Sequence, residues 1–546
     1  MYWGRLLWAT AVVVGATACS GASPSAPRPP AEGMPTRAAA EAVVSAGSPV
    51  AAEPPDDAAP PSFVVASDCE ASVHAAATVL EAGGNAADAT IVAVLVAGLA
   101  HPSASGLGGG GVALYFDAGR ANVTAYDFRI VAPTPLVDAN PWTLEARAPG
   151  RLKERDEAAS ARAMVGRPGE LAGLTALQRD ASRSWPEQIA SALDALDEGF
   201  TVSPYLASAF RDHPDMAAAL GLDVPVAVGT PLPRPRARQT LRRLADLDAV
   251  LPASVRPRAV ARLDLLEVTR GEETMVTPAT AGGFVLWESV SLLGDALPAD
   301  PGARRHRQAE AFGLAVEDRM RHAGAGGTLP QSAEHLAARR ARIDPKRRRQ
   351  WPRVDRREGG TTNVVVIDAE GNAVAWSSSL GHTFGAEAIT EEGIVLNDGL
   401  RLFARPAERR TFGDANAPRP GAPPAVSLAP TLILREGRVV AGLGAAGGEH
   451  IPTALAQVVL RRSPSNVDAP LALPRLRTPA GGGLWLEPSE GDLAPGLRAL
   501  GHHVRTDVPD LTGVVMVTVV DGAPPRFRGY VDPRRGGAVA TSTPVP

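Results

Sequence analysis

The chain has 546 residues and a formal net charge of −4 at pH 7, so it lacks the basic excess that a nucleic-acid-binding protein needs. Its length allows a large hydrophobic core, and its many Gly and Pro residues beside few aromatic ones are typical of a loop-rich chain. With only two cysteines, Cys19 and Cys69, a disulfide framework and a cysteine zinc site are excluded, and the histidines show no metal-ligand spacing. We therefore expect no metal.

Residues 1–18 are typical of a signal peptide. Arg5 precedes an apolar run, residues 6–14, that is too short to span a bilayer comfortably, and small residues then lead to Cys19. Small residues directly before a cysteine resemble a bacterial lipobox, in which Cys19 is the lipidated residue; the alternative is an ordinary secretory signal with an incidental cysteine. We expect an exported protein of the bacterial cell envelope, either anchored to a membrane by lipid or periplasmic.

Residues 19–61 are rich in Ala, Pro, Ser and Gly and poor in bulky apolar side chains, which predicts a disordered tether. The folded body is expected to begin near residue 62. A strand is predicted over 63–67, followed by helices over 69–81 and 86–95.

Four glycines at 108–111 permit a tight turn into the next strand. A phosphate-binding loop is the alternative, but no Gly-Lys-Ser/Thr and no helix follow. The next strand ends in Tyr126, Asp127, Phe128 and Arg129, where an arginine can hold a carboxylate bidentately or form a surface salt bridge.

Further along, the pattern predicts mostly helix. Helical regions are expected at 166–202, in the basic stretch 234–262 as a solvated face, after residue 283 to 293, and at about 309–320. The intensely basic stretch 346–357 reads as an exposed linker.

In residues 359–376 a pair of glycines precedes a predicted β-hairpin. Thr361 and Thr362 open a β-branched run that is typical of a buried strand, residues 368–372 have turn composition, and residues 373–376 can return as the second strand.

Thr361 is a candidate nucleophile. A threonine hydroxyl needs a neighbouring base, and a cut just before Thr361 would make its own amino group, with a pKa of about 8, that base. Gly359 and Gly360 would allow the strained backbone that self-cleavage needs. From the residues alone an ordinary strand is the alternative, because β-branched residues are common strand formers.

The Thr-Thr pair, the buried strand, the Asp-x-x-Gly-Asn-Ala-Val turn and the Thr-Phe-Gly at 383–385 together resemble the γ-glutamyltranspeptidase family. The segment 83–111 and the ending at 532–538 resemble the same regions of that family. The resemblance implies an N-terminal-nucleophile hydrolase with a four-layer αββα sandwich. It also implies a precursor that cleaves itself between Gly360 and Thr361 into a large-subunit portion, 62–360, and a small-subunit portion, 361–546.

The resemblance also assigns roles to single residues. Thr361 takes the place of the nucleophile, Ser379 that of a hydroxyl that helps to activate it, and Gly447 and Gly448 that of the oxyanion-hole glycines, whose N–H groups can approach an oxyanion closely.

Two further positions match the family's substrate-binding residues. Arg129 occupies the place of the arginine that holds the substrate's α-carboxylate. Ser427 matches one of two adjacent serines near the substrate, and the other is replaced by Val426.

The chain departs from the family where the α-amino group of the substrate is bound. Gly381, Gly399 and Leu402 stand at the three matching positions, so no carboxylate remains there, although the neighbouring Asp398 is a candidate after a shift. Losing the charged partner of a buried ammonium typically costs several kcal/mol. Asn363 also replaces a usual histidine.

We therefore expect acyl transfer or hydrolysis of glutathione and other γ-glutamyl amides, with water, an amino acid or a peptide as acceptor and without a metal or organic cofactor. The large and small fragments of one chain would stay together as partners. One alternative is an acylase of the same fold that acts on an amide with a carboxylate but no ammonium. Another is an envelope-binding lipoprotein that has lost catalysis.

Overall fold

The computed structural model describes residues 50–52, 63–134, 164–245, 259–294, 297–350, 359–462, 471–478, 483–507, 512–520 and 526–542. The chain divides into two units, residues 1–46 and 47–546, and all described residues belong to the second. The expected signal peptide and Cys19 lie outside the described residues. Within the described part, no helix combines the length and apolar character needed to cross a membrane.

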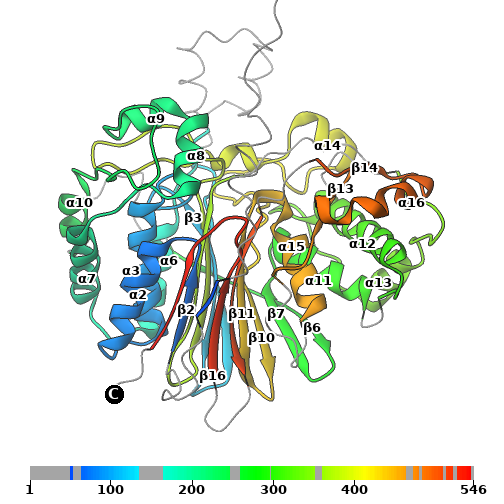
Figure 1. Cartoon of the computed structure of the whole chain (residues 1–546), viewed down its shortest axis with the longest axis horizontal. Helices are drawn as coiled ribbons and strands as arrows, with labels where there is room; N and C mark the ends of the chain where they lie inside the picture. Colours follow the sequence, from blue (N-terminus) through cyan, green and yellow to red (C-terminus); the bar gives the residue numbers. More distant parts are fainter. Residues whose placement is uncertain are drawn as a thin grey trace, which may run out of the picture. The chain divides into compact units, whose positions relative to one another are not determined.

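Two seven-stranded sheets form the centre of this unit (Figure 1). The first, antiparallel throughout, has the order β17 (Ala538–Thr541), β2 (Val64–Ser67), β8 (Thr361–Ile367), β9 (Ala373–Ser379), β3 (Gly110–Asp117), β4 (Asn122–Phe128) and β5 (Ala261–Leu263). The second has the order β1 (Val50–Ala52), β16 (Arg526–Val531), β15 (Gly513–Val520), β11 (Arg438–Ala446), β10 (Thr431–Arg435), β7 (Glu273–Pro278) and β6 (Leu265–Arg270). A small third sheet contains β12 (Leu476–Arg477), β13 (Gly483–Leu486) and β14 (His503–Arg505).

Helices cover the outer faces of the two large sheets (Figure 1). Against the first sheet lie α2 (Glu70–Glu81), α3 (Ala86–Ala100) and α6 (Glu170–Leu177), with α7 (Trp185–Glu198), α8 (Pro204–Asp212), α9 (Pro214–Ala219) and α10 (Ala237–Ala245) on the same side. On the other side lie α11 (Ala281–Leu293), α12 (Pro301–His322), α13 (Ala333–Arg340), α14 (Pro406–Phe412), α15 (Ile451–Arg461) and α16 (Ala494–Ala499). The described layers agree with the αββα arrangement expected from the resemblance.

Close packing of β11 on β8 joins the two sheets. A Cβ atom on Gly442 would lie 2.6 Å from Cγ1 of Val365, and one on Gly444 would lie 2.8 Å from Cβ of Asn363. Glycine at these two positions therefore lets the backbones approach. Since α3 covers its opposite face, β8 is buried along its whole length, which explains its unbroken run of apolar and small polar residues.

The turn between β8 and β9 also anchors α3. Asp368 accepts hydrogen bonds from the backbone N–H of Asn372 and from that of Ala86, the first residue of α3, both at 2.9 Å. The carboxylate thus satisfies a helix N-terminal N–H that has no partner within the helix.

Strands from the two expected portions alternate in the first sheet. β2 belongs to the portion before Thr361, yet it pairs with β17 on one side and β8 on the other, both of which follow Thr361. The two portions therefore cannot separate without breaking ladders of backbone hydrogen bonds.

The structure differs from the sequence-based expectations in three elements. β1 lies inside the expected tether and pairs with β16, because the backbone of an edge strand can pair with any extended segment, whatever its side chains. In the described residues of the basic stretch 234–262, helix is confined to α10, and the stretch ends in β5. α12 is longer than the helix expected at 309–320. Residues 351–358 of the expected basic linker lie outside the described residues.

Asp88 in the first turn of α3 is fully buried and joins α3 to the segment before α7. Its carboxylate accepts hydrogen bonds from the backbone N–H groups of Asn85, Ser182 and Arg183, from the Ser182 hydroxyl at 2.6 Å and from the Gln188 amide at 2.8 Å. Burial alone would raise the pKa of Asp88, but these hydrogen bonds outweigh it and hold the pKa below its usual value.

Replacing this carboxylate should destabilise the protein. We expect Asp88→Asn to lower the free energy of unfolding by about 3 kcal/mol, because hydrogen bonds to a charged acceptor are lost and the new amide N–H group faces donors. Because the folded-state pKa is depressed, the contribution of Asp88 is complete above the unfolded pKa of about 3.9 and disappears as the pH falls through the folded pKa. Denaturant unfolding at pH 7 and at lower pH measures both effects, with the exposed Asp212→Asn as control. Equal stability of the two variants at pH 7 would contradict the assignment.

Candidate active site

Thr361 is the first residue of β8, and its Cα is paired with that of Ser379 at the end of β9. Both residues line one pocket with an empty volume of about 410 Å³, including the solvent at its mouth. The pocket is lined by Gly110, Arg129, Ile130, Thr361, Ser379, Gly381, Leu402, Val426, Ser427, Leu428 and Ile451. The structure therefore brings together four predicted site residues that come from well-separated parts of the sequence: Arg129, Thr361, Ser379 and Ser427.

The peptide bond before Thr361 is contacted by Ser379 at its carbonyl and by the backbone of Ser103 at Gly360. The Ser379 hydroxyl donates a short hydrogen bond to the carbonyl of Gly360 and accepts one from the backbone N–H of Gly381 at 3.0 Å. A Cβ atom on Gly360 would lie 2.5 Å from the carbonyl oxygen of Ser103, so only glycine fits at this position. A hydroxyl donor therefore already points at the carbonyl that the expected self-cleavage would attack.

Behind Thr361 lies a buried ion pair that the sequence analysis did not single out. Arg535 donates to the carbonyl of Thr361 at 2.9 Å, its Nε lies 3.4 Å from Asp68 Oδ2, and its guanidinium stacks 4.0 Å from the ring centroid of Tyr205. Asp68 Oδ1 accepts from the backbone N–H of Asn363 at 2.9 Å. Burial raises the pKa of Asp68, and Arg535 opposes that shift.

Arg535 lies in the segment 532–538, which resembles the end of the γ-glutamyltranspeptidase sequences but to which the sequence alone assigns no role. Asp68 follows the first expected strand. Nothing local marks either residue as a partner of Thr361, because their proximity depends on β17 and β8 flanking β2.

Arg129 directly follows β4 and is almost buried. Its Nε and Nη2 atoms donate to Asp127 at 2.9 and 2.7 Å, and its backbone N–H donates to the same carboxylate. The salt bridge that the sequence left as an alternative is therefore present, but it lies at the catalytic pocket rather than on the open surface. Asp127 fixes the plane of the guanidinium at the pocket wall.

Gly447 and Gly448 follow β11 directly. Gly442 packs over Val365 and Gly444 over Asn363, so β11 runs opposite to β8 across the interface between the sheets. Continued by two residues, this alignment brings the end of β11 to the level of Thr361. Both glycines have positive φ angles, 143° and 65°, which side-chain-bearing residues rarely adopt. They are not among the residues that line the pocket, but Ile451, three positions further on, is.

Ser427 and Asp398 differ in their access to the pocket. The Ser427 hydroxyl lines it, is buried and has no hydrogen-bond partner among the described residues. Asp398 does not line it, because its carboxylate accepts from the backbone N–H of His382 at 2.9 Å and contacts the His382 ring at 2.7 Å. A Cβ atom on Gly381 would lie only 2.1 Å from Asp398 Oδ1, so this carboxylate lies directly behind Gly381.

The other departures from the family make the pocket wall apolar. Leu402 lines the pocket, and Gly399 packs against Ile130, where a Cβ atom on the glycine would lie only 2.5 Å from the isoleucine Cγ2 atom. Ile130, Val426, Leu428 and Ile451 line the same pocket as Leu402 and Arg129, and none of the described lining residues is acidic.

Two groups of side chains outside this pocket have donor atoms close enough to share a metal ion. They are His306, Glu310 and His502, and Glu288, Asp318 and His335. In the first group the two histidine rings hydrogen-bond to each other at 2.7 Å, and in the second group His335 hydrogen-bonds to Glu288 at 3.0 Å. Neither group includes a residue of the catalytic pocket.

The Arg535–Asp68 pair should be essential for stability. We expect Arg535→Gln to lower the free energy of unfolding by about 3–5 kcal/mol, because it leaves a buried carboxylate without its cation. Guanidinium unfolding measures the change. Arg238→Gln, which removes an arginine paired with Asp197 at the surface, serves as control and should change stability by less than about 1 kcal/mol. A similar small loss in both variants would show that Arg535 does not neutralise Asp68.

Comparison with known proteins places these features in a family. The family model described as gamma-glutamyltranspeptidase matches residues 72–250 and 258–542. A glutathione hydrolase 2 from Arabidopsis thaliana is 28% identical over 456 residues, which are 71% of this chain and 75% of that protein. A glutathione hydrolase proenzyme from Bacillus subtilis (strain 168) is 25% identical over 535 residues, 85% of this chain and 88% of that protein.

A solved structure shows the same fold. The cephalosporin acylase from Bacillus halodurans aligns with a TM-score of 0.74 at 19% identity, covering 91% of this chain and 97% of that chain. With the family model matching most of its length and curated relatives aligned over most of theirs, the chain belongs to the γ-glutamyltranspeptidase family of hydrolases and transferases.

Proposed function

We propose that the protein is an amide hydrolase or acyltransferase whose nucleophile, Thr361, is released by cleavage of the Gly360–Thr361 bond in its own chain. The observation that carries the proposal is the contact of the Ser379 hydroxyl with the Gly360 carbonyl, in the pocket that also contains Arg129. Arg129 supplies a site for a substrate carboxylate beside the nucleophile.

Self-cleavage begins with attack of the Thr361 hydroxyl oxygen on the Gly360 carbonyl carbon. A C–O bond forms, the C–N bond breaks, and the hydroxyl proton passes to the departing nitrogen, which leaves an ester and the Thr361 amine. Water then hydrolyses the ester and releases the Gly360 carboxylate. Ser379 stabilises the negative charge that develops on the Gly360 oxygen.

In the cleaved protein the Thr361 amine serves as the base for its own hydroxyl. The hydroxyl attacks the substrate amide, the N–H groups of Gly447 and Gly448 stabilise the oxyanion, and an amine leaves after taking up the proton. Water, an amino acid or a peptide then takes the acyl group from Thr361. These steps need no metal or organic cofactor.

γ-Glutamyl amides, glutathione among them, are the first candidate substrates, because the curated relatives are glutathione hydrolases. Arg129 would hold the α-carboxylate and Ser427 would offer its hydroxyl to the same end of the substrate. The wall, which is largely apolar and has Arg129 but no acidic residue, favours a second candidate. An acyl group with a carboxylate for Arg129 but no ammonium, such as a glutaryl group, needs no acidic partner.

Export and lipid anchoring complete the proposal. They rest on the signal-like residues 1–18 and on Cys19 after small residues. In this setting the enzyme would act on small amides at the cell envelope.

Cleavage at Thr361 can be tested directly. We expect intact mass and N-terminal sequencing of the purified protein to show a fragment of 186 residues that begins at Thr361, since residues 361–546 number 546 − 361 + 1. Thr361→Ala should remain uncut, while Thr361→Ser keeps a hydroxyl and should be cut. Ser379→Ala should slow cleavage by about tenfold or more, as expected for the loss of one oxyanion donor.

A wild-type chain that stays uncut after long incubation would overturn the nucleophile assignment. Cleavage of Thr361→Ala at the same bond would assign the cut to a contaminating protease.

The two substrate classes can be separated with γ-glutamyl-p-nitroanilide and glutaryl-p-nitroanilide, which differ only in the α-amino group. Because no described lining residue is acidic, we expect their kcat/KM values to lie within about tenfold of each other. Arg129→Gln should lower both by about 100-fold, since both lose the carboxylate partner. Leu402→Asp should favour the γ-glutamyl substrate and Leu402→Asn should not. A preference of more than about 100-fold for the γ-glutamyl substrate in the wild type would exclude the second candidate.

A further inference from the structure

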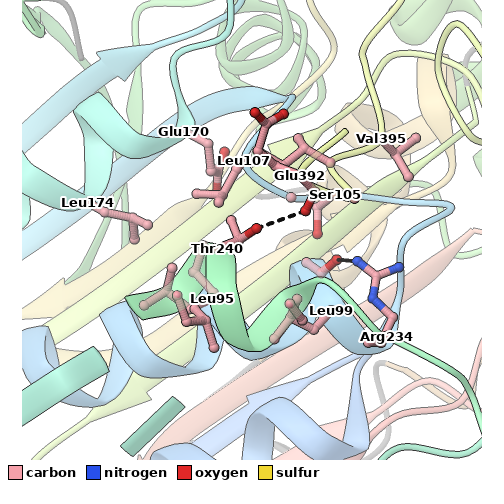
Figure 2. Close-up of a pocket in the computed structure, with 17 residues that line it drawn as sticks. Leu95, Leu99, Ser105, Leu107, Glu170, Leu174, Arg234, Thr240, Glu392 and Val395 are labelled. Atoms are coloured by element: carbon pink, nitrogen blue, oxygen red, sulfur yellow. Dashed lines mark hydrogen bonds between the residues drawn. The ribbon is translucent and has the colours of Figure 1, made fainter. Parts of the chain in front are cut away.

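A second pocket lies on the helical side of the first sheet, and it shares no lining residue with the catalytic pocket (Figure 2). Its empty volume is about 560 Å³, open solvent included. The walls come from α3, α6, α10 and the segments 105–107 and 392–395. Most side chains that face it are apolar, including Leu95, Leu99, Leu107, Leu174, Leu241 and Val395.

The glycine-rich loop at 105–110 separates the two pockets. Ser105, Gly106 and Leu107 line the second pocket, whereas Gly110 lines the catalytic one. A Cβ atom on Gly98 of α3 would lie 2.7 Å from the Cα of Gly106, so helix and loop pack backbone against backbone. The loop therefore packs closely on α3 beside the second pocket and leads directly into β3, whose first residue lines the other pocket.

Arg234 brings a positive charge to one end of this pocket (Figure 2). Its Nη1 atom is buried without a hydrogen-bond partner, and its Nη2 atom makes one long contact, 3.5 Å, to the carbonyl of Gly98. Among the described residues no carboxylate forms an ion pair with Arg234. Burial lowers its pKa to about 10, so it remains a cation at neutral pH.

Two more polar groups in the pocket have unused hydrogen-bonding capacity. Ser105 is 2% exposed, and its hydroxyl has no partner among the described residues. Glu170 is 1% exposed; its Oε1 atom accepts from the indole N–H of Trp376 at 3.2 Å, and its Oε2 atom has no partner. Burial raises the pKa of Glu170 to about 8, so at neutral pH this carboxyl is mostly protonated and adds little negative charge to the pocket. The other acidic lining residue is Glu392.

Buried polar atoms without partners are costly, and at Arg234 the partnerless atom belongs to a cation. An apolar pocket with a few convergent polar groups is the usual form of a small-molecule site. We propose that this pocket binds a small amphipathic carboxylate, with its carboxylate on Arg234 and Ser105 and its hydrocarbon chain along the leucine side chains. Figure 2 shows Arg234 at one end and Leu174 at the other, as such a ligand requires.

The site would have a physical route to the catalytic strand. Trp376 lies in β9, three residues before Ser379, and Glu170 holds its indole. A ligand that fills this pocket therefore lies against Glu170, which holds the indole of the strand that carries Ser379.

Isothermal titration calorimetry of the full chain with hexanoate, octanoate and decanoate tests the proposal. We expect saturable one-to-one binding of at least one of these acids. Octanol, which has the same chain without the charge, should bind at least tenfold more weakly than octanoate. Arg234→Gln should weaken octanoate binding at least tenfold and leave octanol binding unchanged. Leu99→Trp, which enlarges a partly exposed side chain of the pocket lining, should weaken binding of both probes. It provides a second test if Arg234→Gln does not fold, as judged by circular dichroism.

Two matched arginine variants locate the binding. Arg242→Gln removes a charge from the exposed face of α10, and Arg129→Gln removes the carboxylate partner of the catalytic pocket. Both should change octanoate affinity by less than twofold. Absence of saturable binding of any acid would overturn the proposal. So would loss of binding in Arg129→Gln with Arg234→Gln unaffected, which would place the probe in the catalytic pocket, or an equal loss in Arg242→Gln, which would indicate non-specific charge attraction.

Discussion

The candidate catalytic centre depends on the face-to-face packing of β8 and β11, which Gly442 and Gly444 make possible. Because these glycines lack side chains, the backbone of β11 lies close over β8, and its end reaches the level of Thr361. A Cβ atom at either position would lie less than 3 Å from a side-chain atom of β8, so that side chain or the strand would have to move. The interior of a protein is close-packed, so such a displacement would be transmitted to the pocket rather than absorbed locally.

A second constraint acts from within the first sheet. β2 lies between β17 and β8. Asp68 directly follows β2 and Arg535 shortly precedes β17, so the two residues meet beside Thr361 at the start of β8. Arg535 donates a hydrogen bond to the carbonyl of Thr361, and Ser379 donates one to the carbonyl of the preceding residue, Gly360. The backbone around Thr361 is therefore held on both sides by side chains from different strands. Such preorganisation lowers the cost of aligning a hydroxyl with its target.

The candidate catalytic pocket combines one cation with a largely apolar wall. Arg129 is oriented by Asp127, and the positions that would face a substrate ammonium are occupied by Gly381, Gly399 and Leu402. The glycine-rich segment 105–110 contributes Gly110 to this wall, and its residues 105–107 line the pocket at Arg234. Both pockets combine an arginine with aliphatic side chains, and the second pocket is also lined by Glu170 and Glu392.

Local patterns in the sequence were sufficient to predict several elements. The β-branched run after Thr361, the turn at 368–372 and the apolar helices α2 and α3 were predicted because their signals lie within a few residues of one another. The gathering of Arg129, Thr361, Ser379 and Ser427 was expected only through resemblance, and the tertiary structure brings them to one pocket. The tertiary structure alone revealed Asp68 and Arg535 beside Thr361, Asp398 turned to His382, and the partnerless groups at Arg234. These features arise from contacts between residues far apart in the chain, and a burial environment of that kind leaves no local pattern in the sequence.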